Sequence, residues 1–157
     1  LRVSAMTLDA VYDSFELGTC DTTGLADPEY QCPPGESYVD LTGFKPAAVH
    51  DLSANANIVY SFNLGGSLDG FARLEYVYEE DVNLADLIPA SIATRGFKNV
   101  NASVGFSADD WSLMFWGRNM TDHETLYSAF PTTASPGSFS GYPSAPSTYG
   151  VTFKMNL

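Results

Sequence analysis

The sequence predicts an all-β fold, namely an antiparallel, up-and-down transmembrane β-barrel of which this chain supplies six strands. Apolar and polar residues alternate over Thr148–Leu157, and the alternation runs to the last residue. It returns over Asp51–Leu64, where asparagine, a poor strand former, recurs on the polar side and indicates a wet face. The connections between the segments run long, short, long, short, long, as in barrels with long outer loops and short inner turns.

In the N-terminal half, the first expected strand covers residues 1–15, where apolar residues change from odd to even positions. A bulge near Ala5–Met6 would bring them onto one face. Residues 16–50 lack periodicity and are expected to form a long loop. The strand at 51–64 follows, and Gly65–Gly70 is expected to form a tight turn after it.

The C-terminal half is expected to hold the other four strands. Arg73 and Glu75 share one face of the first of them, and this face suits a wet lumen because charge is costly against lipid. A short helix is expected within residues 84–94. In order, the expected elements are a strand at 71–78, a loop at 79–99, a strand at 100–106, a turn at 108–110, a strand at 111–119, a loop at 122–147 and a strand at 148–157.

The composition is typical of one domain of this class. The 157 residues include 9 tyrosines and 10 phenylalanines, and charged residues make up only 17%, below the usual share of about a quarter. No apolar run reaches the length of about eighteen residues that a spanning helix needs. The chain begins directly in a strand-like pattern without a signal peptide, so we expect it to be a piece of a longer protein.

The charge pattern excludes nucleic acid as a partner. The net charge is −12, and the seven lysines and arginines do not cluster into a basic footprint. The acidic residues gather between the expected strands. They keep exposed loops solvated, or alternatively attract cations.

The two cysteines, Cys20 and Cys32, lie in the first expected loop without a histidine or a further cysteine nearby for a zinc site. A disulfide that closes this loop is the economical interpretation, and it implies an oxidising compartment. Two reduced thiols are the alternative.

No enzymatic chemistry, cofactor or metal is expected. The two histidines, His50 and His123, are far apart in the sequence, and no Gly-x-Ser-x-Gly nucleophile motif is present. The acidic run Glu79–Asp81 lacks the spacing of an EF-hand loop.

Two C-terminal segments resemble a known family. Trp111–Asp122, with its aromatic residues, Arg118 and the run Asn119-Met120-Thr121-Asp122, resembles the penultimate strand of TonB-dependent receptors. Gly141–Val151 is similar to that family's lead into its closing strand, and residues 9–32 look like its late strands and loops. The chain departs from the family pattern at Ser147, where arginine is common, and at Leu157, where an aromatic residue is usual.

The resemblance implies that residues 1–157 form the last six strands of a 22-stranded barrel in the bacterial outer membrane. It implies a transport function, the energised uptake of a scarce ligand such as a ferric siderophore, cobalamin or a glycan. The implied partners are outer-membrane lipid, the rest of the barrel, the plug domain and, through that missing part, the TonB complex. The plug domain, the TonB box and the earlier strands are absent from this sequence.

Four aromatic loop residues are candidate ligand contacts, and they serve alternatively as anchors that pack the loop: Tyr127, Phe130, Phe139 and Tyr142. Two other interpretations of the whole chain stay open. One is a soluble, secreted β-sandwich that binds carbohydrate or protein, whose apolar faces would meet each other. The other is a small pore built from several copies of this chain.

Overall fold

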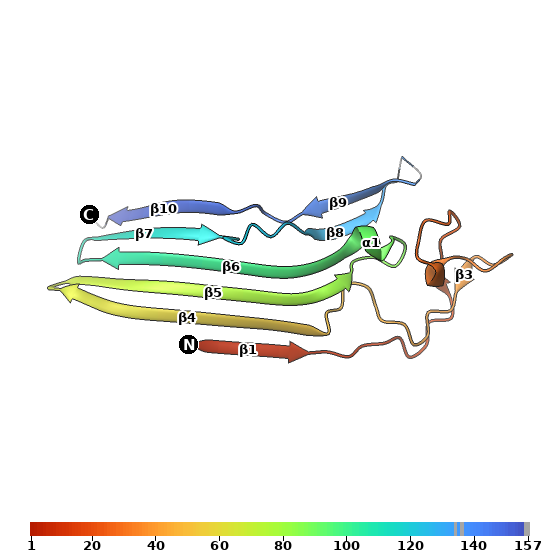
Figure 1. The fold of residues 1–157 in the computed structure, drawn as a ribbon, viewed down its shortest axis with the longest axis horizontal. Coiled ribbons are helices and arrows are strands. Elements are labelled where there is room, and N and C mark those ends of the chain that lie inside the picture. The colour runs from red at the N-terminus through yellow and green to blue at the C-terminus, as the bar shows by residue number, and fades with distance from the viewer. Residues whose placement is uncertain (134, 136, 156–157) are drawn as a thin grey trace.

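A computed structural model describes residues 1–133, 135 and 137–155 and shows one long antiparallel sheet with its loops gathered at one end (Figure 1). The sheet has six strands in the order β1-β4-β5-β6-β7-β10. The all-β prediction is therefore confirmed. The strands are β1 (Arg2–Thr7), β4 (Leu52–Gly65), β5 (Leu68–Asn83), β6 (Thr94–Ser107), β7 (Trp111–Arg118) and β10 (Thr148–Met155).

The predicted rhythm of the connections is also confirmed. Turns at residues 66–67 and 108–110 join β4 to β5 and β6 to β7 at one end of the sheet, which we call the turn end. Gly65 and Gly66 both have positive φ, at 110° and 61°, which explains the glycine pair. Residues 8–51, 84–93 and, in the third connection, 119–133, 135 and 137–147 lie at the opposite end, the loop end (Figure 1).

The strand register separates two faces of the sheet. Leu74 on β5 pairs with Ile58 on β4 and with Ala102 on β6, whereas the adjacent Arg73 pairs with Val59 and Ser103. Paired residues point to the same side, so this alternation continues across all six strands. The apolar face carries Val3, Ala54, Ile58, Tyr60, Leu74, Tyr76, Ala102, Val104, Phe115, Val151 and Phe153, and the polar face carries Ser4, Asn55, Asn57, Arg73, Glu75, Asn101, Ser103, Trp116, Thr152 and Lys154.

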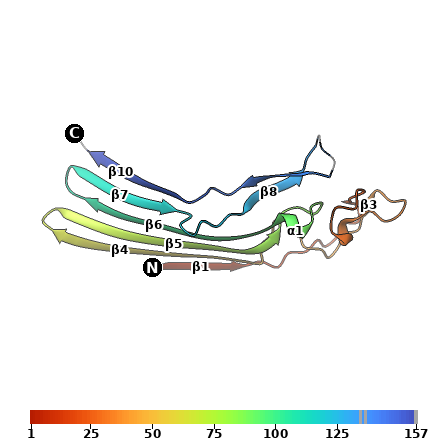
Figure 2. The same ribbon diagram turned by 45° about the horizontal axis from the view of Figure 1, so that its top comes forward.

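The sheet is open and leaves its apolar face exposed. β1 and β10 lie at opposite edges, so the described residues form a curved layer, seen in Figure 2, and not a closed barrel. Tyr60 is 66% exposed and Val151 is 61% exposed on the apolar face. No helix among the described residues is long and apolar enough to cross a membrane.

The first strand is shorter than predicted. β1 ends at Thr7, and its pairing with β4 is regular through Ala5 and Met6, so the predicted bulge is wrong. After Thr7 the chain enters the loop end, where the Tyr12 amide donates to the Phe44 carbonyl. Of the apolar residues that broke the strand pattern, Tyr12 packs against the buried residues of a loop core. Met6 lies in β1, and Leu8 is exposed.

The loop predicted at 79–99 is wrong over most of its length. β5 continues to Asn83 and β6 begins at Thr94, with an irregular register between Glu79 and Val82. The predicted strands at 71–78 and 100–106 were correspondingly too short. The short helix expected within 84–94 is present as α1 (Ala90–Ala93).

The other two predicted loops contain short ordered elements. Residues 16–50 hold the paired strands β2 (Gly18–Thr19) and β3 (Tyr38–Val39) and the 3-10 turn η1 (Pro28–Tyr30). The region 122–147 was expected to be irregular but contains a hairpin, β8 (Leu126–Pro131) and β9 (Phe139–Pro143).

Two small cores stabilise the loop end. One surrounds the fully buried Leu41 and includes Ala26 and Tyr30. The other surrounds the fully buried Ile88 and includes Ala93 and Ala129. Most buried apolar residues of the described chain therefore lie in the loops and not under the sheet.

Candidate functional site

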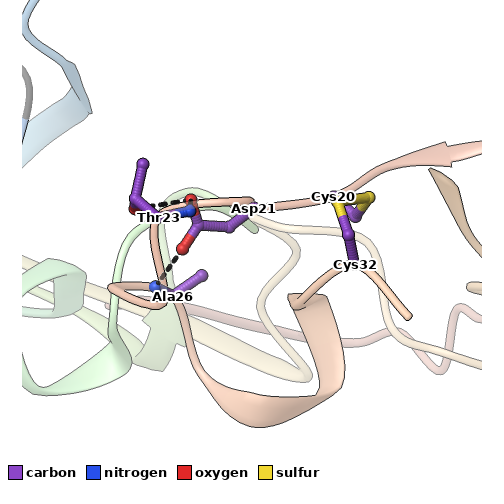
Figure 3. Close-up of a disulfide and its surroundings, with 5 residues drawn as sticks. All are labelled: Cys20, Asp21, Thr23, Ala26 and Cys32. Atoms are coloured by element: carbon purple, nitrogen blue, oxygen red, sulfur yellow. Dashed lines mark hydrogen bonds between the residues drawn. A yellow bond between two sulfur atoms is a disulfide. The ribbon is translucent and has the colours of Figure 1, made fainter. Parts of the chain in front are cut away.

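The disulfide loop is a preorganised part of the loop end. Cys20 and Cys32 form the predicted disulfide, with their Cα atoms 5.0 Å apart. Inside the loop, the Asp21 carboxylate accepts hydrogen bonds from the amides of Thr23 at 2.9 Å and Ala26 at 2.9 Å (Figure 3). It also accepts one from the Leu25 amide at 2.7 Å. One side chain therefore fixes the loop from within.

The same hydrogen bonds set the acidity of Asp21. Desolvation acts to raise the pKa of Asp21, but the bonds from Ala26, Thr23 and Leu25 outweigh it and hold the pKa well below its usual range. The carboxylate therefore stays ionised in the folded loop under mildly acidic conditions.

We expect acid to loosen this loop through Asp21. Because the pKa is lowered on folding, the stabilisation is complete above about pH 4, the ordinary range of an aspartate, and is lost as the pH falls through the folded value. The protection factors of the Leu25 and Ala26 amides, obtained from hydrogen exchange corrected for its intrinsic pH dependence, should fall in acid across this range. In the Asp21→Asn variant this acid-dependent step should disappear, whereas Asp13→Asn, at an exposed loop position, should retain it. Equal acid profiles for all three proteins would contradict the role of Asp21.

An ionic cluster links the first loop to the sheet. Arg95 on β6 forms an ion pair with Glu79 on β5, and both side chains belong to the polar face. His50 lies 3.4 Å from the Glu79 carboxylate, and its Nδ1 atom is 2.8 Å from the Glu80 carbonyl oxygen. These contacts hold the loop residues that precede β4 against the C-terminal part of β5, near the loop end.

The four predicted ligand contacts do not form one site. Phe130 and Tyr142 lie on the same face of the β8–β9 hairpin, with ring centroids 5.8 Å apart and exposed fractions of 40% and 65%. Phe139, in contrast, packs against the Ile88 core and acts as a loop anchor. The Tyr127 ring contacts the Arg95 guanidinium, 5.9 Å from its centroid. Phe130 and Tyr142 are thus the pair best placed to meet a ligand.

Asn119 holds the joint between β7 and the hairpin. Its side chain is buried, and its backbone has the left-handed φ of 47°. The side-chain nitrogen Nδ2 of Asn119 donates to the backbone carbonyls of His123 at 3.2 Å and Ala145 at 2.9 Å. Its side-chain oxygen Oδ1 accepts from the backbone amide of His123 at 3.1 Å. The Asn119 side chain therefore links the segment that follows β7 to the segment that precedes β10.

The polar face contains an open hollow of about 400 Å³, midway along the sheet. Arg73 and Arg118 line it together with one carboxylate, Glu75, and with Trp116 and Thr152. The Arg118 guanidinium lies over the Trp116 ring, 5.2 Å from its centroid, and Trp116 Nε1 donates to Thr152 Oγ1 at 3.2 Å. The hollow brings together two guanidinium groups from strands that are not sequence neighbours.

Comparisons with protein-family models, with curated proteins and with solved structures give no match for this chain. Within the described residues, no group of three histidine, cysteine, aspartate or glutamate side chains is arranged to hold a metal ion. The loop end and the hollow present aromatic rings, guanidinium groups and hydrogen-bonding side chains.

The hollow was not among the sites predicted from the sequence. Alternation places Trp116 and Arg118 on one side of β7, as it places Arg73 and Glu75 on one side of β5. Only the register of β5, β6 and β7 shows that both sides are the same face of one sheet.

Proposed function

We propose that this chain is the C-terminal part of the barrel of a TonB-dependent outer-membrane receptor, and that it serves the energised uptake of a scarce ligand. The observation that carries the proposal is the continuous apolar face, which is shared by all six strands and left exposed. Against a bilayer such a face is buried in hydrocarbon, while the polar face lines a water-filled lumen.

The height of the apolar face supports this proposal. From Leu52 to Phe62, β4 rises about 33 Å, and a tilt of about 40° reduces this to a height of about 25 Å, which matches the apolar band of outer-membrane barrels. Aromatic rings mark the turn end, where Phe62 lies 6.4 Å from Phe106 between ring centroids. Towards the loop end, Lys98 lies over the Tyr78 ring at 5.9 Å, an arrangement suited to the membrane surface.

The loops fit the outer side of such a receptor. The disulfide and the two small cores give them fixed shapes, as an exposed capture surface requires. On this surface Phe130 and Tyr142 supply an aromatic pair for the ligand, which is a ferric siderophore, cobalamin or a glycan. The plug domain and the TonB complex act through parts of the receptor outside this chain.

The rival function, a soluble secreted β-sandwich binding carbohydrate or protein, requires a second layer over the apolar face. In the described chain, the buried apolar side chains gather in the loop cores instead. We therefore favour the membrane proposal over the sandwich. We also favour it over a pore built from several copies, because segments near both ends of the chain, residues 9–32, 111–122 and 141–151, resemble receptor strands.

The deciding experiment measures the native full-length protein extracted from its source membrane in detergent. We expect a species several times heavier than 16.9 kDa that migrates faster in gel electrophoresis when it is not boiled. A species of 16.9 kDa that dissolves without detergent would overturn the proposal in favour of the sandwich. A detergent-requiring species with subunits of 16.9 kDa would overturn it in favour of a multimeric pore.

The aromatic pair can be tested by titrating the full-length receptor with a panel of ferric siderophores, cobalamin and oligosaccharides. For the panel member that binds, the double variant Phe130→Ala/Tyr142→Ala should lose about tenfold or more in affinity, since each aromatic contact contributes about 1 kcal/mol. The Phe139→Ala variant is the matched control, because it removes an aromatic ring that packs on the loop core. It should lower loop stability, measured by protease resistance, more than affinity. Unchanged affinity in the double variant would remove these residues from the site.

A further inference from the structure

The polar face carries a surplus of positive charge in a chain whose net charge is −12. Most of the acidic residues lie in the loops and turns at the two ends of the sheet. The register instead assigns five basic side chains to the polar face against three acidic ones. These are Arg2, Arg73, Arg95, Arg118 and Lys154 against Asp69, Glu75 and Glu79.

On this face, the Arg118 side chain is positioned by an aromatic ring and its guanidinium is available to a ligand. Its guanidinium lies over the Trp116 ring, and no carboxylate of the described residues forms an ion pair with it. Trp116 is itself fixed, because its Nε1 atom donates to Thr152 and its ring covers Gly150. A Cβ atom at Gly150 would lie 2.3 Å from that ring, so a residue without a side chain is required there.

Arg73 supplies a second guanidinium to the same hollow. Its Nη2 atom lies 3.6 Å from Glu75, and the Arg73 side chain remains 49% exposed. In the amide orientation that satisfies Asn57, the oxygen of that side chain accepts from Arg73 Nε and Nη2 at 3.1 and 2.8 Å. These contacts orient Arg73 and leave further donors for a ligand.

We propose that the hollow binds a small organic anion with two or more carboxylates, which are held by Arg118 and Arg73. Ser103 and Thr152 line the same hollow and offer hydrogen bonds to hydroxyl groups of such a ligand, whereas the Asn101 side chain is already bonded to Glu75 and to the Asn119 amide. Trp116 is a positioning residue that holds Arg118. This inference rests on the proposed function, because the polar face then lines the lumen, and it narrows the ligand class to polycarboxylates.

The test is calorimetric titration of the full-length protein in detergent with tricarballylate, and with its uncharged triamide as the reference ligand. We expect tricarballylate to bind and the triamide not to bind. The Arg118→Gln variant should weaken tricarballylate binding by about tenfold or more, and Arg118→Lys should weaken it less. Lys154→Gln is the matched control, because it removes a charge from the same face outside the hollow, and we expect a change below about twofold.

The positioning role of Trp116 has its own readout. Trp116→Ala should weaken binding, whereas Trp116→Phe should restore most of it, since a ring remains for Arg118 to lie on. Two results would overturn the proposal: no tricarballylate binding by the parent protein, or equal losses of binding in Arg118→Gln and Lys154→Gln. If the parent does not bind and ligand-free Arg118→Gln also loses thermal stability, the role of Arg118 is structural.

The electrophoretic shift on boiling is measured on the same samples. A folded barrel that binds no tricarballylate would refute only this inference, whereas a protein without that shift would refute the proposed function.

Discussion

Under the proposed function, replacing Leu74 by arginine is expected to destabilise the full-length protein in lipid vesicles by about 2–4 kcal/mol, which is the cost of a charge at the lipid face of a barrel near the bilayer centre. Leu74 lies on the apolar face of β5 between Ile58 and Ala102, and it is 46% exposed in the sheet itself. In hydrocarbon the guanidinium would lose its hydration without gaining a partner. The loss is measured by reversible unfolding in denaturant.

Val77→Arg is the matched control for this prediction. Val77 lies on the same strand but on the polar face, where it pairs with Asn55 and Asn99 and has Glu75 and Glu79 as near neighbours. We expect a change below about 1 kcal/mol, because this side meets water. If both variants lost the same stability, the two faces would not differ in their surroundings and the membrane orientation would be wrong.

Replacing Asn119 by alanine is expected to lower stability by about 2–4 kcal/mol, through two separate causes. The carbonyls of His123 and Ala145 and the His123 amide lose their partner in a part of the molecule where Asn119 is only 5% exposed. In addition, alanine tolerates the backbone φ of 47° less well than asparagine does, at a cost of about 1 kcal/mol. Denaturant unfolding of the full-length protein gives the total.

Two further variants separate these causes. Asn119→Gly removes the hydrogen bonds but accepts the left-handed backbone, so it should be more stable than the alanine variant by about 1 kcal/mol. Asn63→Ala removes an exposed asparagine beside a turn, whose side chain bonds to Asp69 and Gly65, and should cost less than about 1 kcal/mol. An alanine variant at 119 that lost no more than the one at 63 would show that the joint does not depend on this side chain.

The strand faces were predictable because alternation is a local property. Each residue of Asp51–Leu64 points opposite to its neighbours whatever lies beside the strand, so polarity alone reveals the wet side. The ends of β5 and β6 were not predictable in this way. The run Glu79–Asp81 is typical of a loop, yet Glu79 is held in the ladder by its pair with Arg95, which lies sixteen residues later in the sequence.

The candidate sites also differ in whether local sequence or strand register determines them. Two cysteines in one loop leave only one intramolecular pairing, so the disulfide between Cys20 and Cys32 could be anticipated. The hollow depends on strand register, since Arg73 and Trp116 both pair with Ser103 from opposite sides of β6. The β8–β9 hairpin was missed because serine, proline and glycine interrupt its alternation, and its register is irregular after Leu126.

The two edges of the sheet have a consequence for handling the protein. Along β1 and β10, one row of backbone N–H and C=O groups has no partner among the described residues. β1 runs towards the loop end and β10 runs away from it, so β10 of one copy can pair antiparallel with β1 of the next. Residues 1–157 produced alone are therefore expected to join into fibrous ribbons, and a monomeric sample requires that both edges be covered.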